Sequence, residues 1–276
     1  MKHLVKRVVV GTWRAIVPKG ARNSLRLWLM LEMPDRAPRL IEEFGGGPVV
    51  VLAPHMDDEI IGPGGTVVRH VQAGAKISFI YMTDGMAGDS HLQDLQSRQH
   101  LARQRKDESR RAAEIVGVRD LAFLDGADGA LADTPEMVGG LEKILIERKP
   151  GIIYAPAVTD HHRDHWATNR VLRKAMDRLP APATRDLIIR GYEVWTPAPA
   201  NRMVDISEVI EIKKRAIETF ASQTRLVDYS RAILGLNQYR SMMHLFGRGF
   251  AEAFWEMTSD EYRAAFDRIS LARAAE

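Results

Sequence analysis

Two short segments of the sequence concentrate residues that can hold a metal ion and move protons. The first runs from His55 to Glu59 and packs one imidazole and three carboxylates into five residues. The second, from His161 to His165, holds three of the nine histidines of the chain. Because the chain has no cysteine, any metal site in it must use histidine, aspartate and glutamate ligands. Together the two segments favour a metal-dependent hydrolytic site.

Three residues of these segments form a plausible ligand set. A catalytic zinc site without cysteine takes three His or carboxylate ligands and keeps a further position open for water. His55 and Asp58 are three residues apart, so they face one point if the chain turns into a helical geometry there. We therefore predict that His55, Asp58 and His165 bind Zn²⁺ or another divalent metal.

The remaining polar residues have the types that amide hydrolysis requires. A bound metal lowers the pKa of water to about 7 and polarises a carbonyl, while a carboxylate removes the proton of the water. Asp57 is the predicted general base. His162 is predicted to stabilise the oxyanion or to protonate the leaving amine, and Asp164 to orient a nearby imidazole.

Simpler structural roles would account for each segment taken alone. An acidic run such as residues 57–59 is common at a helix N-terminus, where carboxylates complement the helix dipole. A pair of histidines is more often part of a surface or a core. The glycine-rich run from Gly62 to Gly65 lacks the spacing of a phosphate-binding loop and is interpreted as a turn. The metal site is favoured because both segments directly follow predicted strands.

The elements that position these segments alternate between strands and helices. Strands are predicted over residues 49–52, 76–82, 121–124, 152–155, 187–195 and 203–206, and helices over 64–70, 95–116, 135–148, 165–179, 207–220 and from 259 onward. This pattern predicts an α/β fold with three layers, in which helices cover both faces of a mostly parallel sheet. Ligands bind such sheets at the carboxyl ends of the strands, where the polar segments fall.

Length and composition are those of a globular protein with a real core. The chain has 276 residues, of which 45% are hydrophobic, and a net charge of +3. No apolar run approaches the roughly 20 residues that span a bilayer, and the N-terminus lacks the pattern of a secretory leader. We expect a cytoplasmic protein. Nucleic acid is not an expected partner, because no base-reading motif is visible.

Residues 1–40 stand apart by their charge, with nine Lys or Arg against Glu32 and Asp35. Basic and apolar residues are interleaved there, a pattern typical of a basic amphipathic helix. Such an arm either packs on its own domain with a solvated basic face, or contacts an anionic membrane or an acidic partner at the membrane periphery. We predict that residues 1–44 form this arm and that residues 45–276 form a single domain.

The two segments resemble the hallmarks of the LmbE-like, or PIG-L, N-acetylglucosaminyl deacetylases, which are zinc-dependent hydrolases with a Rossmann-like sheet. The hallmark A-H-P-D-D-E is matched by Pro54 to Glu59, with Met56 in place of proline. The hallmark H-x-D-H is matched by His162 to His165, with Arg163 in place of the common proline. The resemblance covers roughly residues 48–255, and it implies a Rossmann-like fold.

The resemblance also implies roles for the residues that match its motifs. It implies that the zinc ligands are His55, Asp58 and His165. It also implies that Asp57 is the general base and that His162 is the acid partner, with Asp164 in support. Arg105 resembles an arginine that approaches the substrate, and Asp84 lies in a loop similar to the one after the family's second strand. Both are expected to bind substrate, although a surface ion pair with Glu108 is the alternative for Arg105.

The expected function is removal of the acetyl group from an N-acetylated amino sugar of the GlcNAc type by metal-activated water. The expected partner is a small-molecule sugar conjugate, either free or linked to a nucleotide or a lipid. Two alternatives stay open. The same site could hydrolyse another amide, or the protein could be a non-catalytic receptor for a sugar or a nucleotide.

Overall fold

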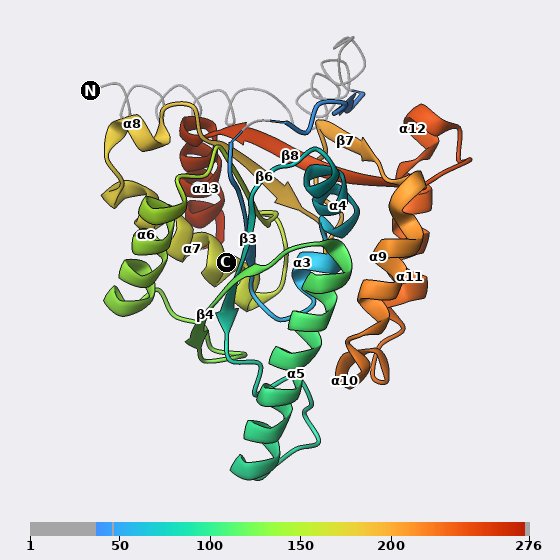
Figure 1. Ribbon diagram of the computed structural model, residues 1–276. Helices are drawn as coiled ribbons and strands as arrows, with labels where there is room; N and C mark the ends of the chain where they lie inside the picture. Colours follow the sequence, from blue (N-terminus) through green and yellow to red (C-terminus); the bar gives the residue numbers. More distant parts are fainter. Residues whose placement is uncertain (1–36, 46, 274–276) are drawn as a thin grey trace, which may run out of the picture. The chain divides into compact units, whose positions relative to one another are not determined.

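The computed structural model describes residues 37–45 and 47–273 (Figure 1). The chain divides into two compact units, Met1–Ala37 and Pro38–Glu276. The predicted basic arm and its predicted membrane or acidic partner fall mainly on residues 1–36, which lie outside the described residues. The domain boundary at residue 45 stays a prediction, and a two-residue strand at Arg39–Leu40 already lies on its N-terminal side.

One eight-stranded sheet runs through the second unit in the order β1-β7-β8-β6-β5-β2-β3-β4. The strands are β1 Arg39–Leu40, β2 Val49–Ala53, β3 Ile77–Thr83, β4 Asp120–Gly126, β5 Ile152–Pro156, β6 Ile188–Tyr192, β7 Arg202–Asp205 and β8 Ala251–Thr258. All neighbours are parallel except β8, which runs antiparallel to both β6 and β7. The predicted α/β fold with a mostly parallel sheet is confirmed.

Helices cover both faces of this sheet (Figure 1). They are α3 Asp58–Ile61, α4 Gly64–Gln72, α5 Leu95–Val116, α6 Pro135–Arg148, α7 Arg163–Arg178, α8 Ala181–Thr184, α9 Ile210–Glu218, α10 Ala221–Thr224, α11 Tyr229–Arg240, α12 Met242–Leu245 and α13 Ser259–Arg273, with a 3₁₀ turn at Ser207–Val209. In the part of the chain that the structure describes, no helix combines the length and the apolarity needed to cross a membrane.

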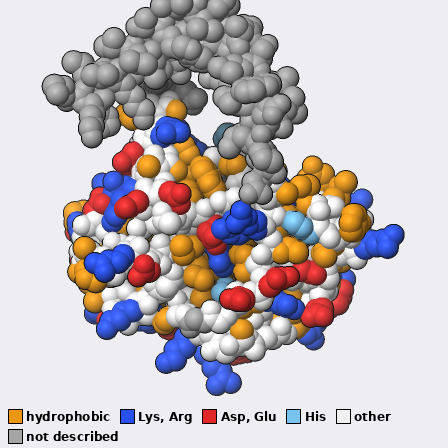
Figure 2. All heavy atoms as spheres, turned by 90° about the horizontal axis from the view of Figure 1, so that it is seen from above, with side chains coloured by type: hydrophobic (Ala, Val, Ile, Leu, Met, Phe, Trp, Pro, Cys, Tyr) orange, Lys and Arg blue, Asp and Glu red, His pale blue; other side chains and the backbone are white. Residues whose placement is uncertain are grey.

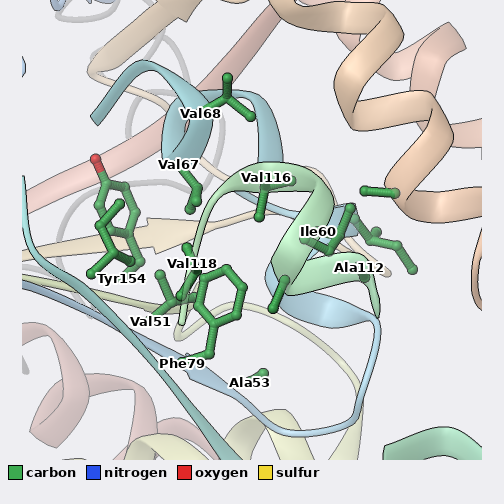
Figure 3. Packing of buried hydrophobic residues seen from close by; sticks show 14 of the residues in the cluster. Val51, Ala53, Ile60, Val67, Val68, Phe79, Ala112, Val116, Val118 and Tyr154 are labelled. Carbon is green, nitrogen blue, oxygen red and sulfur yellow. The ribbon is translucent and has the colours of Figure 1, made fainter. Parts of the chain in front are cut away.

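Alternate residues of the central strands feed two separate cores. Val51 and Ala53 of β2 pack with α4 and α5 on one face, whereas Val50 and Leu52 pack with α6 and α7 on the other. Figure 3 shows the first core, in which Phe79 lies among residues of α3, α4 and α5. Because both faces are covered, β2 and β3 are buried along their whole length, as continuous apolar runs of parallel strands require.

Two strands, β1 and β8, were not predicted. β8 inserts between β6 and β7, in a region that the sequence pattern left unassigned. Its apolar pattern is interrupted by Glu252 and Glu256, whose charges are matched only by distant residues. Glu252 pairs with Lys213 of α9, and Glu256 pairs with Arg190 of β6. Such long-range compensation has no local sequence signature.

The carboxyl ends of the parallel strands point to one end of the unit, which is downward for β3 in Figure 1. Figure 2 shows the opposite face, on which basic, acidic and hydrophobic side chains are intermixed. The shared direction of the strands brings the loops after β2, β4, β5 and β6 together at a single edge.

Candidate active site

A cavity of about 260 Å³ opens at the carboxyl edge of the sheet. Its charged floor consists of buried or half-buried polar residues, which are His55, Asp57, Asp58, Arg105, Asp128 and His162. Its apolar mouth consists of Val194, Trp195, Leu226, Val227 and Tyr229. The floor comes from loops and helices between β2 and α7, and the mouth comes from two later loops and the start of α11.

The turn after β2 places the first group of floor residues. Asp57 has a φ of 150°, which is uncommon for a residue with a Cβ, and the following residue begins α3. The backbone N–H of Asp57 donates to Glu59 Oε2 at 3.0 Å, and the Tyr81 hydroxyl donates to Glu59 Oε1 at 3.0 Å. Glu59 is fully buried and thus holds the turn in shape from the side away from the cavity.

Of the three predicted metal ligands, Asp58 contacts both His55 and His165. Asp58 Oδ2 lies 3.2 Å from His55 Nδ1 and 3.3 Å from His165 Nε2. Two ligands of a tetrahedral zinc ion, each bound at 2.0–2.1 Å, are separated by about 3.3 Å, so these distances suit a shared metal. Ring nitrogens of His55, His162 and His165 lie within 4.8 Å of one another, and so do ligand atoms of His55, Asp128 and Asp164, whereas Asp58 belongs to neither group.

Further carboxylates hold the outer nitrogens of the two imidazoles. His55 Nε2 lies 3.2 Å from Asp164 Oδ2 and 3.3 Å from Asp128 Oδ1. His165 Nδ1 lies 3.5 Å from Asp160 Oδ2. A carboxylate on the far nitrogen is the usual way in which proteins orient a metal-binding histidine.

The charges at this point favour a cation. Burial opposes a positive charge on His165, but Asp58 and Asp160 outweigh it and raise the pKa of the imidazole to about 9. Burial also opposes a charge on His55, but Asp128 and Asp164 outweigh it and raise the pKa of that ring. The ring of His165 is fully buried, and its nitrogens lie 3.3 Å from Asp58 Oδ2 and 3.5 Å from Asp160 Oδ2 without making a hydrogen bond to any described residue. A divalent cation would supply the missing partner and charge, so the residues present fit a metal.

Asp57 projects beside the ligands without joining them. Burial raises the pKa of its carboxyl to about 7, against the opposing charge of Arg105. The Arg105 Nη2 atom lies 3.6 Å from Asp57 Oδ2 and donates to the carbonyl oxygen of Met56 at 3.3 Å. Arg105 Nη1 lies 3.4 Å from Asp128 Oδ2. The guanidinium is therefore built into the floor.

The alternative of a surface ion pair between Arg105 and Glu108 is wrong. Both side chains are buried, and the Glu108 carboxylate instead accepts hydrogen bonds from Ser222, through its backbone N–H at 3.0 Å and through its hydroxyl. One turn of α5 thus directs Arg105 to the cavity and Glu108 to α10.

His162 is positioned as the residue before α7. The backbone N–H of Asp164 donates to His162 Nδ1 at 3.2 Å, which leaves the proton of a neutral ring on Nε2. Burial and the nearby His55 and His165 lower the pKa of His162, so the neutral ring is favoured. The indole of Trp195 stacks on it, with 6.2 Å between ring centroids and an interplanar angle of 19°.

Asp84 lies apart from the other predicted site residues. It is not among the described residues that line the cavity, and its carboxylate accepts a hydrogen bond from the backbone N–H of Met86 at 2.9 Å. Asp128 and Asp160, by contrast, contact the floor histidines and were not predicted. Both follow strands at the carboxyl edge, so the strand-end rule could have found them had every acid after a strand been considered.

Comparison with known proteins finds similarity to sugar deacetylases. The family model described as PIG-L, GlcNAc-PI de-N-acetylase, matches residues 50–176. The diacetylchitobiose deacetylase of Thermococcus kodakarensis is 32% identical over 187 residues, which cover 63% of this chain and 69% of that protein. A probable N-acetyl-alpha-D-glucosaminyl L-malate deacetylase 2 of Bacillus cereus is 28% identical over 186 residues, covering 64% and 83%.

A solved structure shares the fold. The N,N'-diacetylchitobiose deacetylase from Pyrococcus horikoshii superposes with a TM-score of 0.68 at 24% identity, covering 90% of this chain and 96% of that one. The range matched by the family model contains every residue of the charged floor and none of the apolar mouth.

Proposed function

The chain belongs to the PIG-L, or GlcNAc-PI de-N-acetylase, family, and we propose that it removes the acetyl group from an N-acetylated amino sugar of the GlcNAc type. The observation that carries this proposal is that Asp58, on the floor of the cavity, contacts both His55 and the fully buried His165. The sugar deacetylases among its relatives support the class of substrate.

We propose zinc as the metal and His55, Asp58 and His165 as its ligands, with other divalent metals as alternatives. Bound there, a zinc ion would lower the pKa of a water molecule to about 7 and polarise the amide carbonyl of the substrate. Asp164 and Asp128 hold the ring of His55, and Asp160 holds that of His165.

The protein's own residues then move the proton and stabilise the developing charge. Asp57 takes the proton of the attacking water, because it is the cavity-lining carboxylate that neither bridges the two ligand histidines nor pairs with them. His162 donates its Nε2–H to the oxyanion, which is the predicted role that suits a neutral ring. Asp57 returns the proton to the amine nitrogen as the C–N bond breaks, which yields acetate and a free amino sugar.

Two residues, Arg105 and Asp84, are the predicted substrate contacts. Arg105 lines the cavity and can reach a bound sugar while holding Asp57 and Asp128 in place. Asp84 remains a predicted contact that the cavity does not include. The cytoplasmic and membrane-peripheral locations likewise stay predictions.

An acetate-release screen with metal analysis tests the proposal. The purified protein is expected to contain a divalent metal and to release acetate from at least one of free, glycosidically linked, nucleotide-linked or lipid-linked GlcNAc. A chelator should abolish the release, and added zinc should restore it. His165→Ala should lose the metal, whereas the exposed His100→Ala should keep it.

Two results would contradict the proposal in different ways. Bound metal without acetate release from any of these compounds would favour a hydrolase of another amide. No metal and no release, together with sugar or nucleotide binding, would favour a non-catalytic receptor.

A further inference from the structure

The apolar mouth exposes large hydrophobic side chains where a substrate must pass. Trp195 is 52% exposed, Leu226 45% and Val227 39%, and all three line the cavity. Scattered exposed apolar residues need no explanation, but a group of them around a cavity indicates a binding surface. These residues come from the loop after β6 and from the loop between α10 and α11.

The wall of the mouth is held in place before any ligand arrives. The indole of Trp195 stacks on His162 and meets the ring of Tyr229 edge-on, with 6.2 Å between centroids and an angle of 73°. The backbone N–H of Trp195 donates to Asp160 Oδ2 at 3.2 Å. A fixed aromatic face costs little conformational entropy when it binds a flat apolar surface.

The mouth carries no charge, and this restricts the group that it can receive. Of the described residues that line the cavity, Arg105 is the one Lys or Arg, and Asp57 and Asp128 hold its guanidinium. An anionic group such as malate or a diphosphate would therefore lose its hydration without gaining a free cationic partner. A neutral group with an apolar face suits this surface better.

The volume of the cavity indicates which part of the substrate lies at the floor and which part lies at the mouth. At about 260 Å³ the cavity is smaller than the roughly 300–1,000 Å³ of pockets for drug-sized ligands. It can hold one sugar ring with its acetamide group against the floor, so a second group attached to that ring must lie at the mouth. Gln223 lines the same cavity, and although it is largely buried it offers an amide for a hydroxyl group of such a second ring.

We propose that the apolar mouth is a subsite for a second, neutral pyranose ring, which stacks its C–H face on Trp195. Building on the proposed function, the preferred substrate is then a neutral GlcNAc-containing disaccharide, whereas free GlcNAc fills only the floor. The hydroxyl-bearing edges of the second ring stay in contact with water and Gln223, while its apolar face is removed from water.

Comparing two variants at Trp195 tests this subsite. In the active enzyme we expect kcat/KM for N,N'-diacetylchitobiose to exceed that for GlcNAc, and Trp195→Ala to lower this ratio about tenfold, the size expected of one lost aromatic contact. Trp195→Phe, which keeps an aromatic face, should retain most of the ratio. Tyr239→Ala, which removes an aromatic ring that is 64% exposed and outside the cavity, should not change it.

A binding measurement separates the subsite from the chemistry. In an Asp57→Asn background, which should turn over substrate only slowly, calorimetry should show that Trp195→Ala weakens diacetylchitobiose binding about tenfold more than GlcNAc binding. An unchanged ratio of disaccharide to GlcNAc, in kcat/KM or in affinity, in Trp195→Ala would overturn the subsite. Tighter binding of GlcNAc-malate, or of an octyl glycoside of GlcNAc, than of the disaccharide would also overturn it. Acetate release with an unchanged ratio would refute the subsite alone, whereas no acetate release from any sugar would refute the proposed function.

Discussion

The charged floor and the apolar mouth lie in one cavity but are built from different parts of the chain by different means. The floor belongs to residues 50–176, the range that the family model matches, and it consists of buried acids and imidazoles that balance one another. The mouth begins only at Val194 and consists of exposed apolar side chains on loops. The floor thus defines the class of reaction, and the mouth has the means to select the substrate.

One buried ion pair ties the later part of the chain to the turn beside the floor. Lys213 Nζ donates to the carbonyl oxygens of Ile61 at 2.9 Å and Gly62 at 3.2 Å, and to Glu252 Oε1 at 2.6 Å. Glu252 in turn accepts the backbone N–H groups of Gly65 and Thr66, both at 2.7 Å. The later part of the chain therefore clamps the turn that follows the proposed ligand on α3.

Removing the proposed base should give the largest effect on activity. The change should be limited to the charged floor. Asp57→Asn is expected to lower kcat by about 10²–10⁴, the usual contribution of a positioned general base. Metal content should stay unchanged, because Asp57 is not a proposed ligand. Steady-state kinetics and metal analysis check both points, with the exposed Asp107→Asn as the matched control. Full activity in Asp57→Asn would refute its role as base.

Breaking the clamp should give the next largest effect, on the stability of the turn beside the floor. Lys213→Met leaves the Glu252 carboxylate buried without its partner, so the free energy of unfolding should fall by about 3–5 kcal/mol. Urea denaturation measures this, with the neighbouring, only half-buried Lys214→Met as control. Adding Glu252→Gln to Lys213→Met should recover part of the loss. Equal stability of the two lysine variants would show that the clamp does not stabilise the fold.

A smaller effect, on metal affinity, is expected at Asp160, which connects a proposed metal ligand to the apolar mouth. Asp160 lies against His165 Nδ1 and also accepts the backbone N–H of Trp195. Asp160→Asn keeps the shape of the side chain but weakens the support of the imidazole, so metal affinity should fall about 10–100-fold. Competition with a chelating dye measures the metal affinity. Asp133→Asn, at a residue that pairs with Lys174, serves as the control. Unchanged affinity would remove Asp160 from the metal centre.

The smallest effect should come from trimming the mouth. Leu226→Ala removes a side chain that is already 45% exposed, so KM for diacetylchitobiose should rise by about threefold while kcat stays the same. Stability should hardly change. Leu271→Ala, at a leucine that is 75% exposed and outside the cavity, provides the comparison. A fall in kcat would instead place Leu226 with the floor.

The sequence predicted the floor far better than the mouth, and the reason is physical. His55, Asp58 and His165 could be placed because parallel strands end at one edge, and apolar runs locate those ends. Asp128 was missed because the run Gly126 to Gly129 has the composition of an ordinary turn.

The mouth offered no comparable signal. Trp195 falls at the end of a predicted strand, whereas β6 stops at Tyr192 and leaves the indole on a loop. Leu226 and Val227 lie in a stretch without periodicity, and their position depends on how α10 and α11 pack. Loop conformation follows from long-range contacts, so apolar residues on loops cannot be assigned to a surface from their spacing alone.

The position of β8 has a consequence for the order in which the protein is made. A ribosome releases residues 50–176 early, yet the strand between β6 and β7 and the carboxylate that holds the start of α4 are supplied only by residues 251–258. Until that segment emerges, β6 and β7 have no common neighbour and Lys213 lacks the counter-charge of Glu252. Binding of a metal at the proposed site is therefore expected only after residues 251–258 have emerged, and nascent chains that stop before residue 251 should not retain a metal ion.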